Sequence, residues 1–178
     1  LLCDYAGLPA LAEDERVVEA GRFLVDAILD MPQGFTHRDF QSSNMVVTAQ
    51  GLGLLDFQDA LMGPDVYDLV ALTRDSYVVL PDQVLEDMIA RYCAGLKREG
   101  LLRGFEAGLR RRHDLVTVHR KCKDAGRFVF IDRVKGNPAF LRHIPASLGC
   151  VRSALGRLPE LSALREALGP ILESEPGS

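Results

Sequence analysis

The sequence predicts an α+β domain that is mostly helical and contains one small β-hairpin. Helical spacing of apolar residues dominates from residue 66 onward. Two runs of strand-forming residues, Met45–Val47 and Leu52–Phe57, are separated by Thr48-Ala49-Gln50-Gly51, and this pattern predicts the hairpin. The chain has 178 residues, 47% hydrophobic and 26% charged, which is enough to bury a core. We therefore expect one domain, or one lobe of a larger protein.

The helices are predicted from apolar stripes and from the residues that begin or end them. Pro81 is placed to open a helix and Gly100 to close it. The spacing of apolar residues does not decide whether Arg127–Val134 continues a helix or is extended. The segment Glu173–Ser178 is expected to be a frayed tail. The predicted helices are 13–29, 66–73, 81–100 and 105–122, with two short ones near 140–155 and 161–168.

The apolar residues from Phe35 to Asn44 follow neither the helical nor the strand period, which predicts a loop rich in polar side chains. It contains Asp39 and Asn44, and Asp56 follows twelve residues after Asn44 at the end of the second predicted strand. Because the hairpin folds back on itself, we expect the three side chains to face one cleft. Phosphoryl transfer requires a carboxylate that accepts a hydroxyl proton and oxygen ligands for a divalent metal. The three residues supply this set.

The order His37-x-Asp39-x-x-x-x-Asn44, then strand, turn and strand with Asp56, is the catalytic-loop and metal-site order of kinases. The segment from about Phe35 to Asp75 resembles the aminoglycoside phosphotransferase family, a small-molecule branch of the kinase-like fold. Asp56-Phe57-Gln58-Asp59-Ala60 and Gly63-Pro64-Asp65-Val66-Tyr67-Asp68-Leu69 resemble its DFxDA…GDPxYDLA pattern. The catalytic loop and 69–75 look most like the bacterial kinases of N-acetylmuramate and N-acetylglucosamine, which act on the anomeric hydroxyl.

The resemblance implies that residues 1–178 are the C-terminal, catalytic and substrate-binding lobe of a kinase-like fold, whose hairpin carries a metal-binding Asp. It implies that Asp39 is the catalytic base and that Asn44 and Asp56 bind Mg²⁺, with ATP as the phosphoryl donor. His37 and Asp68 would support the loop. A place in substrate binding is a hypothesis for Arg38, Gln41, Gln58 and Asp59; for Arg38 we favour a local ion pair.

Several features of the family's larger relatives are missing from the sequence. It contains neither a G-x-G-x-x-G loop nor a strand lysine of the V-A-I-K type, so we expect the nucleotide-binding N-terminal lobe to belong to the same protein. The chain also begins at Leu1 without Met, which suggests a piece of a longer protein. The fragment by itself is therefore expected to be inactive. Gln41 and Gln58 stand where protein kinases have Lys and Gly, which disfavours a protein kinase.

Two alternatives to an amino-sugar kinase stay open at this point. One is a kinase of aminoglycosides or other small alcohols, and the other is a non-catalytic pseudokinase module that only binds a ligand. The expected partners are a sugar and a nucleotide, and neither nucleic acid nor membrane. The net charge is −4, Trp is absent and no apolar run approaches about 18 residues. Four widely spaced cysteines indicate reduced thiols in a cytoplasm and no zinc site.

A basic stretch covers Arg110–His113 and continues through His119–Lys121 and Lys123. On a helix these residues spread over several faces, so a solvated surface is expected. An alternative hypothesis is that Arg112 or Arg120 binds the lactyl carboxylate of N-acetylmuramate.

Overall fold

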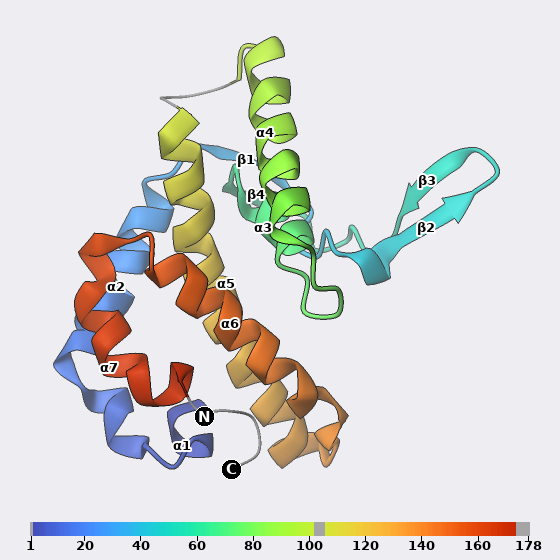
Figure 1. Cartoon of the computed structure of the whole chain (residues 1–178). Helices are drawn as coiled ribbons and strands as arrows, with labels where there is room; N and C mark the ends of the chain where they lie inside the picture. The colour runs from blue at the N-terminus through green and yellow to red at the C-terminus, as the bar shows by residue number, and fades with distance from the viewer. Residues whose placement is uncertain (1, 102–105, 174–178) are drawn as a thin grey trace. The chain divides into compact units, whose positions relative to one another are not determined.

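The computed structural model describes residues 2–101 and 106–173 and divides into two compact units (Figure 1). Unit 1 comprises Leu1–Ala27 and Thr117–Ser178, and unit 2 comprises Ile28–Val116. All the residues predicted to form the site belong to unit 2. The predicted class is confirmed at the level of secondary structure, since helices dominate and the strands form two small antiparallel pairs.

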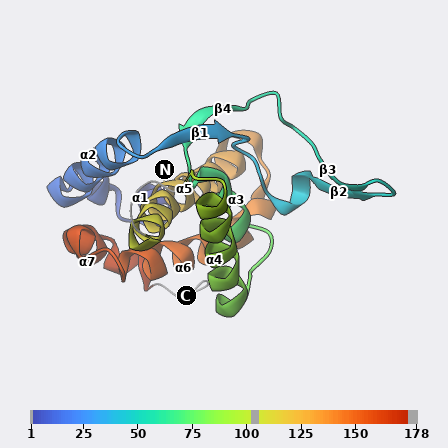
Figure 2. The ribbon, with the colours of Figure 1, turned by 90° about the horizontal axis from the view of Figure 1, so that it is seen from above.

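Unit 2 contains both pairs of strands. Strand β1 (Gln33–Thr36) pairs with β4 (Leu61–Pro64), and β2 (Met45–Thr48) pairs with β3 (Gly51–Leu54). The β2–β3 hairpin projects away from the β1–β4 pair in both views (Figure 2). The predicted hairpin is confirmed, although its second strand ends at Leu54 instead of Phe57. The β1–β4 pair was not predicted, and it makes the loop prediction wrong for residues 35–36, which belong to β1.

The helices of unit 2 are α3 (Tyr67–Thr73), α4 (Asp82–Arg98) and the first part of α5 (Glu106–Lys135), with a short 3₁₀ turn, η2, at Ser42–Asn44. Helix α3 is deeply packed, because Val66, just before it, and Val70 have no exposed surface. Pro81 and Gly100 flank α4 as predicted, and Gly100 adopts a positive φ of 66°.

Unit 1 is helical throughout its described residues. Its apolar cluster joins α5 to the segment after it through Ala125, Phe128, Val129 and Ile144. The ring of Phe128 stacks on Phe140 with centroids 6.0 Å apart. In chain order the elements outside α5 are α1 (Leu2–Tyr5), η1 (Pro9–Glu13), α2 (Glu15–Leu29), η3 (Pro138–His143), α6 (Ile144–Leu155), η4 (Pro159–Leu161) and α7 (Ser162–Leu172).

The predicted helices are all present, and the undecided segment 127–134 is helical because α5 runs unbroken to Lys135. Two predictions fall partly on residues outside the described ranges: Phe105, with which the predicted helix 105–122 begins, and the tail beyond Glu173. The stripe predicted for α2 is only partly buried, since Leu24 is covered while Val25 and Leu29 are exposed. No described helix is both long and apolar enough to span a bilayer.

The prediction that the basic residues of α5 form a solvated surface is wrong for several of them. His113, Arg120 and Lys121 are each at most 4% exposed. A charge inside a protein needs a partner, and the Lys121 ammonium lies 3.0 Å from the Asp124 carboxylate. Arg111 and Lys123 are exposed, as expected.

The four cysteines are free thiols, in agreement with the predicted absence of disulfides. Burial raises the pKa of the Cys122 thiol to about 12. The thiolate is the reactive form of cysteine, so this thiol is inert near neutral pH.

Candidate active site

The loop that carries the kinase-like motif begins at the end of strand β1. Thr36 and His37 are nearly completely buried there. The Thr36 hydroxyl donates a 2.9 Å hydrogen bond to the Leu61 carbonyl, which fixes the end of β1 to β4. Gly63 packs against the same threonine, because a Cβ at position 63 would lie 2.9 Å from Thr36 Oγ1. The loop therefore starts from a closely packed position.

Asp68, in the first turn of α3, holds the start of the loop by its backbone. Its Oδ2 accepts a 2.6 Å hydrogen bond from the His37 amide, and its Oδ1 accepts a 2.9 Å bond from the Arg38 amide. Hydrogen bonds to an ionised carboxylate are about twice as strong as neutral ones. The His37 ring lies edge-on to Phe40, with centroids 6.1 Å apart. Both of its ring nitrogens are buried without a hydrogen-bond partner in the described structure.

Asp39 follows directly, with an exposed side chain on a fixed backbone. Its carbonyl accepts two hydrogen bonds of 2.9 Å, from the Gln41 amide and from Nδ2 of Asn44. Asn44 therefore spans the loop and ties its end to Asp39. This arrangement presents a carboxylate to solvent while restricting the movement of the chain that bears it.

The backbone of Asn44 also brings Asp56 to the loop. Its carbonyl accepts a 2.9 Å hydrogen bond from the Leu55 amide, so Asp56 is one residue from a direct contact with the loop. Among the described residues, the non-glycine positions with positive φ are Arg38 (74°) and Asp56 (58°). Left-handed conformations are costly outside glycine and are often found at functional sites. Both lie beside the motif residues.

The side chains proposed for substrate binding are less closely tied to this arrangement. Arg38 Nη1 donates a 3.4 Å hydrogen bond to the Asp59 carbonyl, not an ion pair to its carboxylate. Gln41 is half-buried, and its amide is engaged with Asp39 as described above. Gln58 and Asp59 are exposed in the turn after Asp56, and Gln58 takes no part in these hydrogen bonds.

Asn44 and Asp56 carry oxygen atoms of the kind that binds Mg²⁺. In the described residues, no group of three or more His, Cys, Asp or Glu side chains is arranged to hold a metal. Mg²⁺ at a nucleotide site uses one or two protein side chains, and phosphate and water complete its shell. Because Nδ2 of Asn44 donates a hydrogen bond to the Asp39 carbonyl, Oδ1 of Asn44 is the atom of this side chain that could bind the metal. The donor set, one amide oxygen and one carboxylate, fits this ion.

A contact that the sequence analysis missed holds the far end of the loop. Oδ2 of Asp75 accepts hydrogen bonds from the Ser42 amide at 2.8 Å and from the Ser42 hydroxyl at 2.5 Å. The available signal was the position of Asp75, seven residues after Asp68 and immediately beyond the same short helix.

A second missed cluster centres on Asp65, three residues before Asp68. Its carboxylate is bonded by Nε and Nη2 of Arg112 at 3.2 and 3.0 Å, and its carbonyl accepts a 2.5 Å bond from the Tyr92 hydroxyl. Burial, together with the carboxylates of Asp65 and Asp68, raises the pKa of Tyr92 to about 12, against the opposing effect of Arg112. Arg112 is thus engaged inside the fold, which removes the basis for assigning it to the substrate's carboxylate.

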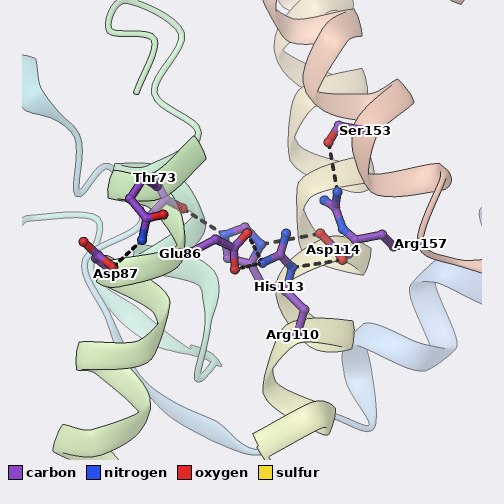
Figure 3. A network of polar contacts seen from close by, with 9 residues as sticks. Thr73, Glu86, Asp87, Arg110, His113, Asp114, Ser153 and Arg157 are labelled. Atoms are coloured by element: carbon purple, nitrogen blue, oxygen red, sulfur yellow. Dashed lines mark hydrogen bonds and ion pairs between the residues drawn. The ribbon is translucent and has the colours of Figure 1, made fainter. Parts of the chain in front are cut away.

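Helix α3 is also joined to α5 through His113, as Figure 3 shows. Thr73 donates its one hydroxyl proton to the Leu69 carbonyl at 2.7 Å, so Nε2 of His113, 2.8 Å away, must be the donor to Thr73. Burial lowers the pKa of His113, and the ring is therefore neutral at pH 7. Nearby, the Arg110 guanidinium bridges Glu86 of α4 and Asp114 (Figure 3).

The part of the chain that contains this site is similar to a known protein family. The model of the phosphotransferase enzyme family matches residues 4–103, which include the loop, both strand pairs and α3. The chain belongs to the phosphotransferase enzyme family. The kinase-like fold that this family implies agrees with the order of loop, hairpin and helix seen in unit 2.

Three curated proteins are similar to the chain over most of its length. Each is named an N-acetylmuramate/N-acetylglucosamine kinase. The relatives from Pseudomonas putida and Neisseria meningitidis are both 32% identical, over 152 and 154 residues, and the one from Pseudomonas aeruginosa is 35% identical over 150. These matches cover 83–85% of the chain but only 44–46% of each relative. The chain thus spans less than half the length of its curated relatives.

Proposed function

We propose that the protein carrying this chain transfers the γ-phosphoryl group of ATP to the anomeric hydroxyl of N-acetylmuramate or N-acetylglucosamine. The substrate class is supported by the names of the three relatives, and the reaction class by the family. One observation about the chain carries the proposal: the backbone around Asp39 is fixed by Asp68 and Asn44 while the Asp39 carboxylate is exposed.

Asp39 acts as the general base in this proposal. Its carboxylate accepts the proton of the sugar hydroxyl while the hydroxyl oxygen forms a bond to the γ-phosphorus and the bond to the ADP oxygen breaks. Proton transfer to a positioned carboxylate contributes about 10²- to 10⁴-fold to a rate. The fixed backbone keeps that carboxylate in place before the substrate binds.

Asn44 and Asp56 are the proposed ligands of Mg²⁺, which neutralises charge on the transferring phosphate when it is bound. The Leu55–Asn44 hydrogen bond keeps the two residues near one another in the chain's own fold. His37, packed on Phe40, and Asp68 support the loop. Substrate contacts by Arg38, Gln41, Gln58 and Asp59 remain a hypothesis, supported by their positions beside the loop and Asp56.

The chain is, in this proposal, the C-terminal lobe, residues 1–178, and a nucleotide-binding N-terminal lobe completes the site. Two facts support this division. The relatives are more than twice as long as the region they share with the chain. Large apolar side chains are also exposed on the strands of unit 2, among them Phe35, Val47, Leu52 and Met62.

The isosteric substitution Asp39→Asn tests the function in the full-length protein. We expect kcat for amino-sugar phosphorylation to fall by about 10²-fold or more, with binding of Mg²⁺–nucleotide retained. Asp56→Asn should instead weaken Mg²⁺-dependent nucleotide binding, which calorimetry measures directly. Asp82→Asn, on the exposed start of α4, is the matched control and should change neither quantity.

Undiminished turnover by Asp39→Asn would refute the assignment of the base. A wild-type protein that binds nucleotide but transfers no phosphoryl group to a panel of sugars and aminoglycosides would point to a binding module instead. Transfer to aminoglycosides in preference to the two amino sugars would refute the proposed substrate.

A further inference from the structure

Asp75 occupies an unusual position for a carboxylate that the motif does not include. It lies just beyond helix α3 and only 7% of its surface is exposed. It accepts three hydrogen bonds: two from Ser42 to Oδ2, and one of 2.8 Å from the Tyr77 amide to Oδ1. Burial of a carboxylate is costly without such bonds. The residue is therefore held in one orientation, with Oδ2 directed at Ser42.

Ser42 begins the 3₁₀ turn that ends the catalytic loop at Asn44. Asp75 consequently holds the loop where it turns into the hairpin, while Asp68 holds it where it leaves β1. Only Asp39, Phe40 and Gln41 lie between the two attachments. Asp68 lies in the first turn of α3 and Asp75 just beyond its end, and the helix residues Leu69, Val70 and Ala71 are buried. The loop is thus attached at two points to one rigid element.

We propose that Asp75 is a positioning residue that acts through Ser42 to fix Asp39 and Asn44. The inference rests on the proposed function, because it concerns the geometry of that reaction. Movement of a catalytic group by about 1 Å can cost about 100-fold in rate. With the Ser42 attachment lost, Asp68 alone remains of the two attachments to α3, and Asp39 and Asn44, which are bonded to each other, gain freedom together. The loss falls on kcat, because Asp75 and Ser42 are assigned no contact with either substrate.

The test compares Asp75→Asn, Ser42→Ala and the double variant in the full-length protein. In Asp75→Asn an NH₂ group replaces one carboxylate oxygen and opposes the donors of Ser42 or, after a flip, the Tyr77 amide, so the contact is disturbed in either orientation. We therefore expect kcat to fall about 10- to 100-fold with both KM values within about threefold. Ser42→Ala removes the hydroxyl bond but keeps the amide bond, and should lower kcat less. Because both changes act through one contact, the double variant should be no slower than Asp75→Asn.

Backbone amide exchange at Ser42 provides a readout that does not depend on activity. Exchange there should be slow in the wild type and faster in Asp75→Asn, with the amides of His37 and Arg38, held by Asp68, unchanged. Asp87→Asn is the control, since that exposed carboxylate on α4 accepts its hydrogen bond from Gln83, one turn away on the same helix. If Asp75→Asn fails to fold, Ser42→Ala carries the comparison alone.

The outcomes separate the two proposals. An active wild type whose Asp75→Asn and Ser42→Ala variants keep the same kcat overturns the positioning role and leaves the proposed function intact. A rise in KM at constant kcat, or additive losses in the double variant, also overturns it. A wild type that transfers no phosphoryl group overturns the proposed function, and the positioning role with it, even if Ser42 exchange responds to Asp75.

Discussion

Arg112 illustrates at the scale of a single residue how a charge can be committed to the fold instead of to a ligand. Its side chain is 11% exposed and that of Asp65 is 14% exposed, and the guanidinium binds the carboxylate through two nitrogens. Removing one partner from a buried ion pair leaves the other charge without compensation. A positive charge near an active site is therefore not enough to assign a residue to substrate binding.

The Arg112→Ala variant should lower the free energy of unfolding by about 3 kcal/mol, since it strands the Asp65 carboxylate. Arg112→Lys should recover only part of this, because an ammonium cannot reproduce the two-nitrogen contact. Denaturant unfolding measures both, with Arg111→Ala, at an exposed neighbouring position, as the control. The KM values for N-acetylmuramate and N-acetylglucosamine should keep their ratio. A selective rise for N-acetylmuramate would restore the role in binding the lactyl group.

The sequence could not reveal this pairing, because Asp65 and Arg112 are 47 residues apart and nothing in either local pattern links them. The same applies to Asp75 and Ser42, 33 residues apart. Asp39, Asn44 and Asp56 could be proposed from the sequence because their spacing along the chain is itself the signal. Residues that recognise substrate or metal can follow a motif, whereas the residues that hold them are chosen by the tertiary fold.

At the scale of elements, the β1–β4 pair is the part of the fold that positions the loop and that the sequence concealed. Both strands have four residues, and Gly34, Gly63 and Pro64 are poor strand formers. The β2–β3 hairpin was evident because strand-forming residues flank a turn that ends in Gly51, whose φ is 122°. Similarly, the length of α5 was ambiguous because residues 128–131 are four consecutive apolar residues, and such a run fits a strand as well as a helix.

Gly63 and Gly34 are opposite one another in the β1–β4 pair and provide a matched test of that packing. Gly63→Ala would place a Cβ 2.9 Å from Oγ1 and 3.3 Å from Cγ2 of buried Thr36, so we expect a loss of about 1–3 kcal/mol in unfolding free energy. A Cβ at Gly34 meets nothing within 4 Å, and Gly34→Ala should be close to neutral.

Thermal unfolding of the two alanine variants measures this difference. Because Thr36 immediately precedes His37, Gly63→Ala should also lower kcat of the full-length protein beyond its effect on stability. Equal stability of the two variants would mean that Thr36 moves without cost and that the start of the loop is not closely packed.

At the scale of the whole molecule, the exposed apolar side chains of unit 2 are its least typical feature. Phe35 and Met62 are opposite one another in the β1–β4 register and are 76% and 64% exposed. Val47 and Leu52 form the equivalent pair on the hairpin, at 91% and 68% exposed. Isolated exposed apolar residues are ordinary, but contiguous groups mark surfaces that bind another part of a protein. We propose that these two pairs of side chains contact the proposed N-terminal lobe.

The substitution Phe35→Ser distinguishes a covered surface from an ordinary exposed one. In the 178-residue chain the side chain is exposed, so the change should leave unfolding nearly unaffected. In the full-length protein it should cost about 2 kcal/mol, because burial of a phenylalanine side chain contributes about 1.5–3 kcal/mol. Val79, 81% exposed before α4, gives the control Val79→Ser, which should be neutral in both proteins. The proposed lobe arrangement requires the two proteins to differ at position 35. Equal effects would mean that Phe35 is exposed to solvent in the complete protein. The N-terminal lobe would then contact some other surface of the chain.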